Sequence, residues 1–268
     1  MTSTSVLEGY REAITALCAE VAVFIRSQVD LVQQNDIEVK DENSLVSFVD
    51  KEAERLIVEA LTQLTPEAGF ITEEDTEDQR NKALTWIIDP LDGTTNFLMG
   101  IPHFSISIAL IEDGVTTLGI VYEVMLDIAY TAIKGVGAWE GKRPLQLRPT
   151  DNINEAIVVT GFPYRRGLNI DASLEVLKFC VVHCRGIRRL GSAALDLAYV
   201  AAGKVDLYYE NALNIWDLAA GALLITEAGG IVTDYHNSQN YLKNGSIIGG
   251  SAAFHKEIIS VIQKAHQI

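Results

Sequence analysis

Cysteine is scarce in this sequence of 268 residues, which contains Cys18, Cys180 and Cys184. Three cysteines without a repeated spacing form no disulfide framework, and this favours a reducing compartment. Cys180, His183 and Cys184 lie close together in the chain. A structural zinc site needs about four ligands, however, and no second ligand pair is evident. The sequence therefore favours ordinary structural roles for these residues over a zinc site.

Long hydrophobic runs are also absent. No apolar stretch approaches the roughly 20 residues that a membrane-spanning helix requires. The first residues, MTSTSVLEGYREAITAL, lack the basic stretch and following apolar stretch of a secretory signal peptide. We therefore expect a soluble cytoplasmic protein without a membrane partner.

Positively charged residues are few: the sequence has 21 Lys and Arg residues and 36 Asp and Glu residues, so its net charge is −15. Such an acidic surface repels phosphates, so we expect no nucleic-acid partner. The sequence also contains no Walker motif and no GxGxxG loop after a strand. A small anionic substrate stays possible, because a bound metal ion can invert the charge of one pocket.

The patterns that are present predict a mixed α/β protein without repeats or long linkers. Apolar residues recur at helical spacing over residues 6–25 and again from Val49. Strand patterns follow in the first half of the chain, at residues 85–89, 104–111, 119–124 and 128–133, with a hairpin turn at Asp113 and Gly114. The second half alternates strands at 187–190, 206–210, 231–234 and 246–250 with helices at 171–183, 191–203, 215–230 and 252–266. We interpret residues 1–268 as one domain, with an α+β half at about 1–150 and an α/β half at about 151–268.

The segment WIIDPLDGTTNF, residues 86–97, is the first candidate for chemistry. Asp89 ends an apolar strand, and Pro90 is expected to stop that strand because it fixes φ and removes a donor. Asp92 is then expected to begin a helix whose first free amides, at Gly93 and the two following threonines, could hold a phosphate. Two carboxylates beside such amides suit Mg²⁺ or Mn²⁺ better than Zn²⁺.

The alternative is that Asp92 is a simple helix cap, which would be the better interpretation if it stood alone. Further carboxylates occur in equivalent settings, however. Glu73 follows a short strand, Asp217 lies at the start of a helix, and Asp50 opens the second helix. Carboxylates at the ends of different elements can converge on one pocket, which favours a metal site.

These motifs together resemble those of the inositol monophosphatase family along nearly the whole chain. The resemblance rests on VDKEAE at 49–54, ITEED at 71–75, WIIDPLDGTTNF at 86–97, RRLGSAALDLAYVAAG at 188–203 and IWDLAAGALLITEAGG at 215–230. It implies a layered αβαβα fold and Mg²⁺-dependent hydrolysis of a phosphate monoester. It also implies sensitivity to lithium and a homodimer. Apolar strands such as IAYTAI, residues 128–133, could lie near the interface of such a dimer.

The resemblance assigns roles residue by residue. A first metal ion would be held by Glu73, Asp89 and the carbonyl of Leu91, a second by Asp89, Asp92 and Asp217, and a weaker third by Glu73 through water. Thr94, paired with Asp50, would orient the attacking water and help to deprotonate it, and Glu73 would assist catalysis as a ligand. The substrate would contact the amides of Gly93 and Thr94, the ligands Asp92 and Asp217, and an alcohol pocket formed by Gly191, Ser192, Ala193 and Glu210. Lys40 is either a mobile positive charge over the site or an ordinary surface lysine.

Three positions depart from the family pattern. Thr72 replaces the usual glycine before the paired glutamates, Ser44 replaces an aspartate and Ser47 replaces a common threonine. Thr72 is next to a proposed metal ligand, so we expect it to bear on metal affinity. None of the proposed ligands is missing.

The string Thr95-Asn96-Phe97 resembles the inositol monophosphatase branch, whereas bisphosphate nucleotidases usually carry DGTKEF and histidinol-phosphate enzymes DGTRxF. Glu210 suits a polyol, because a carboxylate accepts from hydroxyl groups. The expected reaction is hydrolysis of inositol monophosphate to inositol and phosphate. The alternatives are another sugar phosphate, a nucleotide 3′-phosphate, or a regulatory or scaffold role in protein binding.

Overall fold

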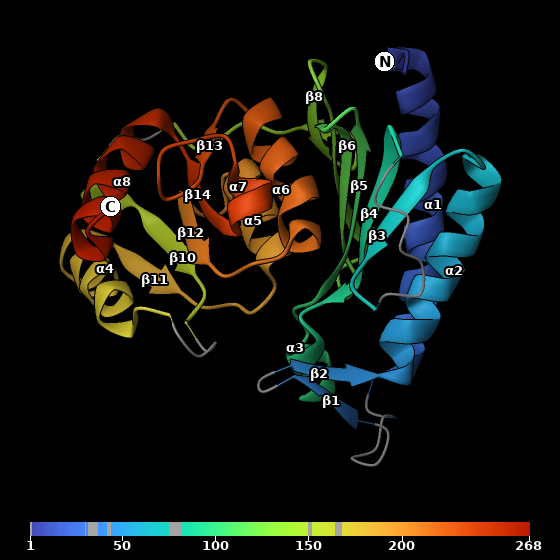
Figure 1. Cartoon of the computed structure of the whole chain (residues 1–268), viewed down its shortest axis with the longest axis horizontal. Coiled ribbons are helices and arrows are strands. Elements are labelled where there is room, and N and C mark those ends of the chain that lie inside the picture. The colour runs from blue at the N-terminus through green and yellow to red at the C-terminus, as the bar shows by residue number, and fades with distance from the viewer. Residues whose placement is uncertain are drawn as a thin grey trace.

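The computed structural model describes residues 2–29, 31, 48–74, 82–149, 152–163 and 168–268, and the backbone alone of residues 37–41 and 44–47. Its elements form five layers in the order helices, sheet, helices, sheet, helices (Figure 1). The predicted αβαβα sandwich is confirmed. No helix in the described part of the chain is long and apolar enough to cross a membrane.

The first outer layer consists of α1 (Thr4–Gln28) and α2 (Phe48–Leu64), which cover one face of a seven-stranded sheet (Figure 1). Apolar residues recur along one side of each helix and are buried against the sheet. Ile14 and Ile57 pack there in one core cluster with Trp86 of the sheet. The helical periodicity in the sequence therefore reflects burial on a single face, as predicted.

The seven-stranded sheet has the order β3-β4-β5-β6-β7-β8-β9. Its strands are β3 (Gly69–Thr72), β4 (Leu84–Asp92), β5 (Ser105–Glu112), β6 (Val115–Glu123), β7 (Ile128–Ile133), β8 (Gly137–Glu140) and β9 (Arg143–Pro144). Only β3 and β4 are parallel among these neighbours. Asp113 and Gly114 join β5 to β6 with φ values of 49° and 80°, as a tight primed hairpin turn requires, so the predicted hairpin is confirmed.

The middle layer contains α5 (Ala193–Ala201) and α6 (Ile215–Glu227), which lie between the two sheets (Figure 1). These helices are rich in small residues because both of their sides are covered. A Cβ atom on Gly221 of α6 would lie 2.5 Å from the Leu197 side chain of α5, and one on Gly119 of β6 would lie 2.9 Å from the Ala220 carbonyl oxygen. Gly229, with φ 90°, follows the end of α6 in the position of a glycine cap.

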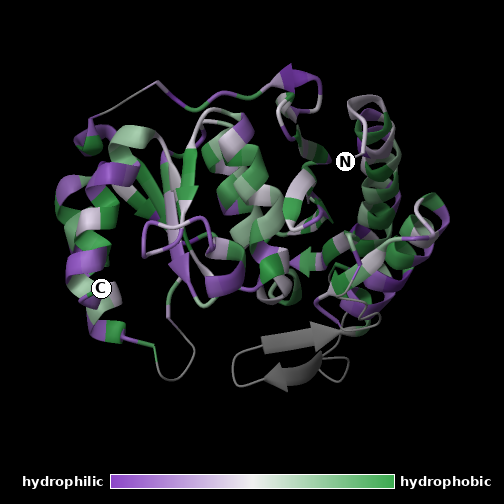
Figure 2. Cartoon of the chain, turned by 45° about the horizontal axis from the view of Figure 1, so that its top comes forward, coloured by the Kyte–Doolittle hydropathy of each residue, from purple (hydrophilic) through white to green (hydrophobic). Residues whose placement is uncertain are grey.

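The second sheet has the order β11-β10-β12-β14-β13. Its strands are β10 (Ile157–Thr160), β11 (Gly186–Arg188), β12 (Leu207–Asn211), β13 (Ile231–Thr233) and β14 (Ser246–Gly250). β10 is parallel to β11 and β12, and β14 is antiparallel to β12 and β13. Helices α4 (Ile170–His183) and α8 (Ala252–His266) form the last layer, and hydrophilic colour appears on their outer surface (Figure 2).

Five shorter elements complete the described chain: the strands β1 (Ile37–Asp41) and β2 (Ser44–Ser47), which form a two-stranded antiparallel sheet, the helices α3 (Thr94–Leu98) and α7 (Tyr241–Asn244), and the 3₁₀ turn Ile153–Glu155. Of these, α3 bears directly on function, because it follows β4 at the edge of the sheet.

The prediction that Pro90 stops the strand and that Asp92 begins a helix is wrong. β4 continues through Pro90 to Asp92, and α3 begins two residues later, after the left-handed Gly93. Asp89 pairs with Ser107 and Asp92 pairs with Ser105. Between these two pairs β4 advances by three residues and β5 by two, so β4 contains a β-bulge. This bulge tolerates a proline that cannot donate to the ladder.

The bulge has a consequence for the two aspartates. Side chains alternate between the faces of a regular strand, so residues three apart point to opposite faces. The extra residue between Asp89 and Asp92 removes that alternation and brings the two carboxylates to the same side of β4.

Candidate active site

Three carboxylates from two parts of the chain meet where β4 ends. Asp89 and Asp92 come from β4, and Asp217 comes from the first turn of α6. One carboxylate oxygen from each lies within 4.8 Å of the others, and these residues are the group that could hold a metal ion within the described part of the chain. The expectation that carboxylates at the ends of different elements converge on one site is therefore confirmed for these three residues.

Burial and mutual repulsion dominate the electrostatics of this cluster. Burial, followed by the charges of Glu73, Asp92 and Asp217, raises the pKa of Asp89 well above its ordinary value. Burial and the charges of Asp92 and Glu73 raise the pKa of Asp217 in the same way. A divalent cation would relieve this repulsion, and an all-oxygen set of ligands is the chemistry that Mg²⁺ prefers. The residues present thus fit a magnesium site.

Glu73 joins the cluster because β3 runs beside β4. Its backbone amide donates to the Ile88 carbonyl at 3.2 Å, which extends the pairing of the two strands by one residue. Glu73 consequently lies next to Asp89, and the two side chains share a hydrogen bond. The next residue, Glu74, donates its amide to the buried Glu54 carboxylate at 2.8 Å.

Asp92 also ties the first sheet to the middle layer. Its Oδ2 atom accepts a hydrogen bond of 2.6 Å from the Ser192 hydroxyl and one of 2.7 Å from the Ala194 amide, at the start of α5. Burial raises the pKa of Asp92, while these hydrogen bonds act in the opposite direction. Asp217 is fixed in a comparable way, because its Oδ2 atom accepts from the Asn214 amide at 2.6 Å in a capping box.

Thr94 and Asp50 are brought together although 44 residues separate them. The Thr94 hydroxyl donates to Asp50 Oδ1 at 3.0 Å and also lies 3.1 Å from the Leu91 carbonyl oxygen. Leu91 is held in turn, since its amide donates to Asp89 Oδ1 at 3.0 Å. A hydroxyl, a buried carboxylate and a backbone carbonyl therefore adjoin the acidic cluster.

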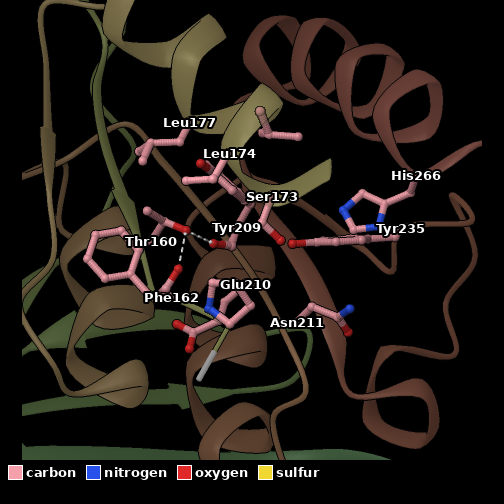
Figure 3. Close-up of a pocket in the computed structure, with 13 residues that line it drawn as sticks. Thr160, Phe162, Ser173, Leu174, Leu177, Tyr209, Glu210, Asn211, Tyr235 and His266 are labelled. Carbon is pink, nitrogen blue, oxygen red and sulfur yellow. Dashed lines mark hydrogen bonds between the residues drawn. The ribbon is translucent and has the colours of Figure 1, made fainter. Parts of the chain in front are cut away.

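A cavity of about 130 Å³ opens beside this cluster. It is lined by the predicted residues Asp92, Gly191, Ser192, Ala193, Glu210 and Asp217, and by Thr160, Gly161, Arg189, Asp196 and Leu213. A smaller cavity of about 30 Å³ adjoins it and shares Thr160, Gly161 and Glu210. Figure 3 shows the Glu210 carboxylate pointing away from Tyr235 and His266 in that smaller cavity.

Glu210 is held at the centre of this region. Burial raises its pKa to about 7, although hydrogen bonds from Tyr208 and the Gly161 amide and the charge of Arg189 act against the shift. The Tyr208 hydroxyl donates to Glu210 Oε2 at 2.6 Å. A Cβ atom on Gly161 would lie 1.9 Å from Glu210 Oε1, so only glycine leaves space for this carboxylate.

Comparison with known proteins agrees with this arrangement. The sequence pattern of the inositol monophosphatase family matches residues 7–267. This chain belongs to the inositol monophosphatase family. The family consists of Mg²⁺-dependent phosphatases, so the chain is assigned to the hydrolases at that level.

Individual relatives carry two different names. The chain is 43% identical to the inositol-1-monophosphatase of Rhizobium meliloti over 234 residues, covering 87% of this chain and 88% of the relative. It is 40% identical to the Nus factor SuhB of Vibrio cholerae over 226 residues, covering 84% and 85%. Among solved structures it resembles the IMPase of Thermotoga maritima, with 30% identity, a TM-score of 0.88 and coverage of 97% and 98%.

Not every position that the family resemblance singled out can be placed. The side chains of Lys40, Ser44 and Ser47 lie outside the described residues. Thr72 ends β3 and is 1% exposed, directly before Glu73. Of the group Cys180, His183 and Cys184, both cysteines are free, and the metal-binding group found in the described ranges does not include them.

Sequence reasoning missed several residues at the site, and Asn96, Arg189 and Asp196 are three of them. Asn96 of α3 donates to the carbonyls of His103 at 2.7 Å and Leu190 at 2.8 Å, so it joins α3 to the segment before β5 and to the loop before α5. Arg189 and Asp196 line the cavity. All three lie inside the motifs that carry the family resemblance, and this position was the sequence evidence that could have identified them. Nothing in the sequence distinguishes a cavity residue of such a motif from a core residue.

Proposed function

We propose that this protein hydrolyses a small phosphate monoester with Mg²⁺, and that inositol monophosphate is its substrate. The observation that carries the proposal is the carboxylate cluster of Asp89, Asp92 and Asp217, joined by Glu73, beside a polar cavity. The names of several relatives support the same substrate.

The metal ligands are assigned as the family resemblance implies. Glu73, Asp89 and the Leu91 carbonyl hold one ion, Asp89, Asp92 and Asp217 hold another, and Glu73 reaches a weaker third. Mn²⁺ is a second suitable ion because it takes the same oxygen ligands. When bound, such ions polarise the phosphoryl group and stabilise the charge that develops on the leaving alcohol.

The chain's own residues position the reactants. The amides of Gly93 and Thr94 hold the phosphate. The Thr94 hydroxyl orients the attacking water, and Asp50 accepts the water's proton by way of this hydroxyl. The alcohol lies against Gly191, Ser192 and Ala193, where Glu210 accepts from its hydroxyl groups. Lys40 remains a candidate for a positive charge over the phosphate.

Phosphate release from a panel of monoesters tests this proposal. The panel contains inositol 1-phosphate, a hexose phosphate, a nucleoside 3′-phosphate and phenyl phosphate, each assayed with Mg²⁺ and again with EDTA. We expect release that depends on Mg²⁺ and is fastest with inositol 1-phosphate. Faster hydrolysis of the hexose phosphate or the nucleotide would refute inositol monophosphate as the substrate but would still support a phosphatase. No release from any ester would refute the activity.

A regulatory role is the second candidate, because several relatives are named Nus factor SuhB. Such a role requires a partner rather than turnover, and the two functions are compatible. Pull-down from a cell lysate with the wild type and with Asp217→Asn separates them. A partner that binds both proteins equally would show a role independent of hydrolysis.

A homodimer in the cytoplasm is proposed from the family and from the general frequency of two-fold dimers. The apolar strand IAYTAI, which suggested an interface in the sequence, does not support it. That strand is β7, and its residues 129–133 are buried within the monomer. Light scattering should give twice the 29.3 kDa mass of one chain, and a mass of 29.3 kDa at micromolar concentration would refute the dimer.

A further inference from the structure

The buried carboxylate of Glu54 holds the chain directly after the proposed metal ligand Glu73. Glu54 lies on α2 and is 0% exposed. Its Oε2 atom accepts a hydrogen bond of 2.8 Å from the amide of Glu74, which lies 20 residues further along the chain. A hydrogen bond to a charged acceptor is about twice as strong as one between neutral groups. This contact therefore attaches the segment after β3 firmly to α2.

Glu73 lies between two peptide groups that are both held. Its own amide donates to the Ile88 carbonyl oxygen at 3.2 Å. The paired register of β3 and β4 ends at Thr72 and Ile88, so the amide of Glu74 lies beyond the strand pairing and is held by Glu54 instead. Holding the peptide groups on both sides of a residue fixes the direction of its Cα–Cβ bond. Glu54 therefore helps to set the direction in which the Glu73 side chain leaves the backbone.

The same face of α2 holds a second part of the site. Asp50 precedes Glu54 by four residues, so the two side chains are neighbours on one face of the helix. Asp50 Oδ1 accepts from the hydroxyl of Thr94, the first residue of α3, at 3.0 Å. The helix itself packs beside β3 and β4 through apolar residues of the same core cluster (Figure 1). One helix thus holds the chain both at Glu74 and at Thr94.

We propose that Glu54 is a positioning residue for Glu73, and that it sets the affinity for the metal ion that Glu73 holds. The inference rests on the proposed function, because Glu73 is a metal ligand by that proposal. Groups that orient a metal ligand from behind typically contribute about 10- to 100-fold to metal affinity. Asp50 acts on the attacking water through Thr94. Two carboxylates one turn apart on α2 therefore have separate effects, Glu54 on metal binding and Asp50 on the chemical step.

Binding of Mn²⁺ to the metal-free protein tests this role without turnover. Electron paramagnetic resonance of the free ion gives the number and the affinity of the bound ions. Glu54→Met fills the space of the buried carboxylate but cannot accept from the Glu74 amide, and we expect it to weaken one site about tenfold. Glu54→Gln should bind nearly as the wild type does, because its amide oxygen still accepts. Glu73→Gln identifies the site, since it should weaken the same one.

A double variant separates positioning from a general loss of stability. If Glu54 acts through Glu73, adding Glu54→Met to Glu73→Gln should weaken Mn²⁺ binding no further, because coupled substitutions are not additive. Leu61→Ala is the matched control. Leu61 is also 0% exposed on the buried side of α2, so its replacement should lower the melting temperature and leave the Mn²⁺ affinity unchanged. Glu54→Ala takes the place of Glu54→Met in all comparisons if the latter does not fold.

Three results would overturn the proposal. The first is wild-type Mn²⁺ affinity in Glu54→Met when Glu73→Gln has lost affinity. The second is a further loss in the double variant, or an equal loss in Leu61→Ala, either of which would make Glu54 a structural residue of α2. Under both results the proposed function stands. The third is a wild type that binds no Mn²⁺, which would refute the metal site of the proposed function together with this inference.

Discussion

Replacing Thr94 by alanine removes the hydroxyl that connects the first residue of α3 to Asp50 of α2. The structure gives this hydroxyl a carboxylate partner, Asp50 Oδ1, at 3.0 Å, and Asp50 itself is 2% exposed. A threonine hydroxyl is too weak a base to deprotonate water by itself, so it needs such a partner to accept the proton of the attacking water. We therefore expect Thr94→Ala to impair the chemical step rather than substrate binding.

The magnitude follows from the contacts. A positioned acid–base group contributes about 10²- to 10⁴-fold, so kcat should fall by that factor while KM changes little. The buried Asp50 also loses one donor, which should cost about 1–3 kcal/mol of unfolding free energy. Thr94→Ser keeps the hydroxyl and should retain most of kcat. The Mg²⁺ dependence should change little, because neither Thr94 nor Asp50 is a proposed metal ligand.

Steady-state kinetics with inositol 1-phosphate at several Mg²⁺ concentrations checks this prediction in Thr94→Ala, Thr94→Ser and Asp50→Asn. Thr95→Ala is the matched control, because Thr95 is the next residue on α3 and its side chain is exposed. An Asp50→Asn enzyme with normal kcat would remove the pair from the mechanism. A rise in KM alone in Thr94→Ala would reduce Thr94 to a phosphate contact.

Three other predictions concern the acidic cluster and the cavity. Asp92→Asn and Asp217→Asn should each lose nearly all phosphate release while keeping the fold by circular dichroism, and Asp217→Asn should unfold at higher denaturant concentration without metal because repulsion is relieved. The folded-state pKa of Glu210, about 7, exceeds its ordinary value of 4.5. The folded state therefore binds more protons than the unfolded state between pH 4.5 and about 7. The unfolding free energy without metal should fall by up to about 3 kcal/mol as the pH rises through this range. Denaturant titrations at several pH values should show a smaller fall in Glu210→Gln. Millimolar Li⁺ should inhibit phosphate release at modest Mg²⁺, and an unchanged rate would count against the inositol monophosphatase branch but not against the fold.

Secondary structure could be predicted where one face of an element is buried. The last helix was expected at residues 252–266 and spans Ala252–His266, because its apolar residues recur on one side. β10 was missed although it lies inside the second sheet, since Ile157–Thr160 has only four residues and no alternation. Such a short buried run cannot be assigned from periodicity alone.

Local rules failed where a partner strand decides the outcome. A proline within an apolar strand argues for its end, and the sequence around Pro90 contains nothing to contradict that rule. The bulge that accommodates Pro90 exists only in the pairing of β4 with β5, through contacts at Ser105 and Ser107. The apolar β7 was likewise interpreted as a possible interface, although its neighbours in the same chain bury it.

The candidate site was predictable as a set of residues but not as a geometry. Motif matching identified Asp89, Asp92 and Asp217 together, whereas their approach to within 4.8 Å depends on two separate features of the fold. The bulge turns the two β4 aspartates to one side, and the middle helical layer brings Asp217 to the same place. Neither feature is visible in a linear pattern.

The middle layer links the stability of the protein to its chemistry. Close contacts of small residues, such as Gly221 against Leu197 and Gly119 against Ala220, let α5 and α6 fit between the two sheets. Asp92 then reaches the first amides of α5 and Asp217 caps α6, so the repelling carboxylates are held by backbone donors. Helix N-termini stabilise negative charge, which partly offsets the cost of burying these groups. The packing that separates the sheets is therefore also what keeps an acidic cluster in place before any cation binds.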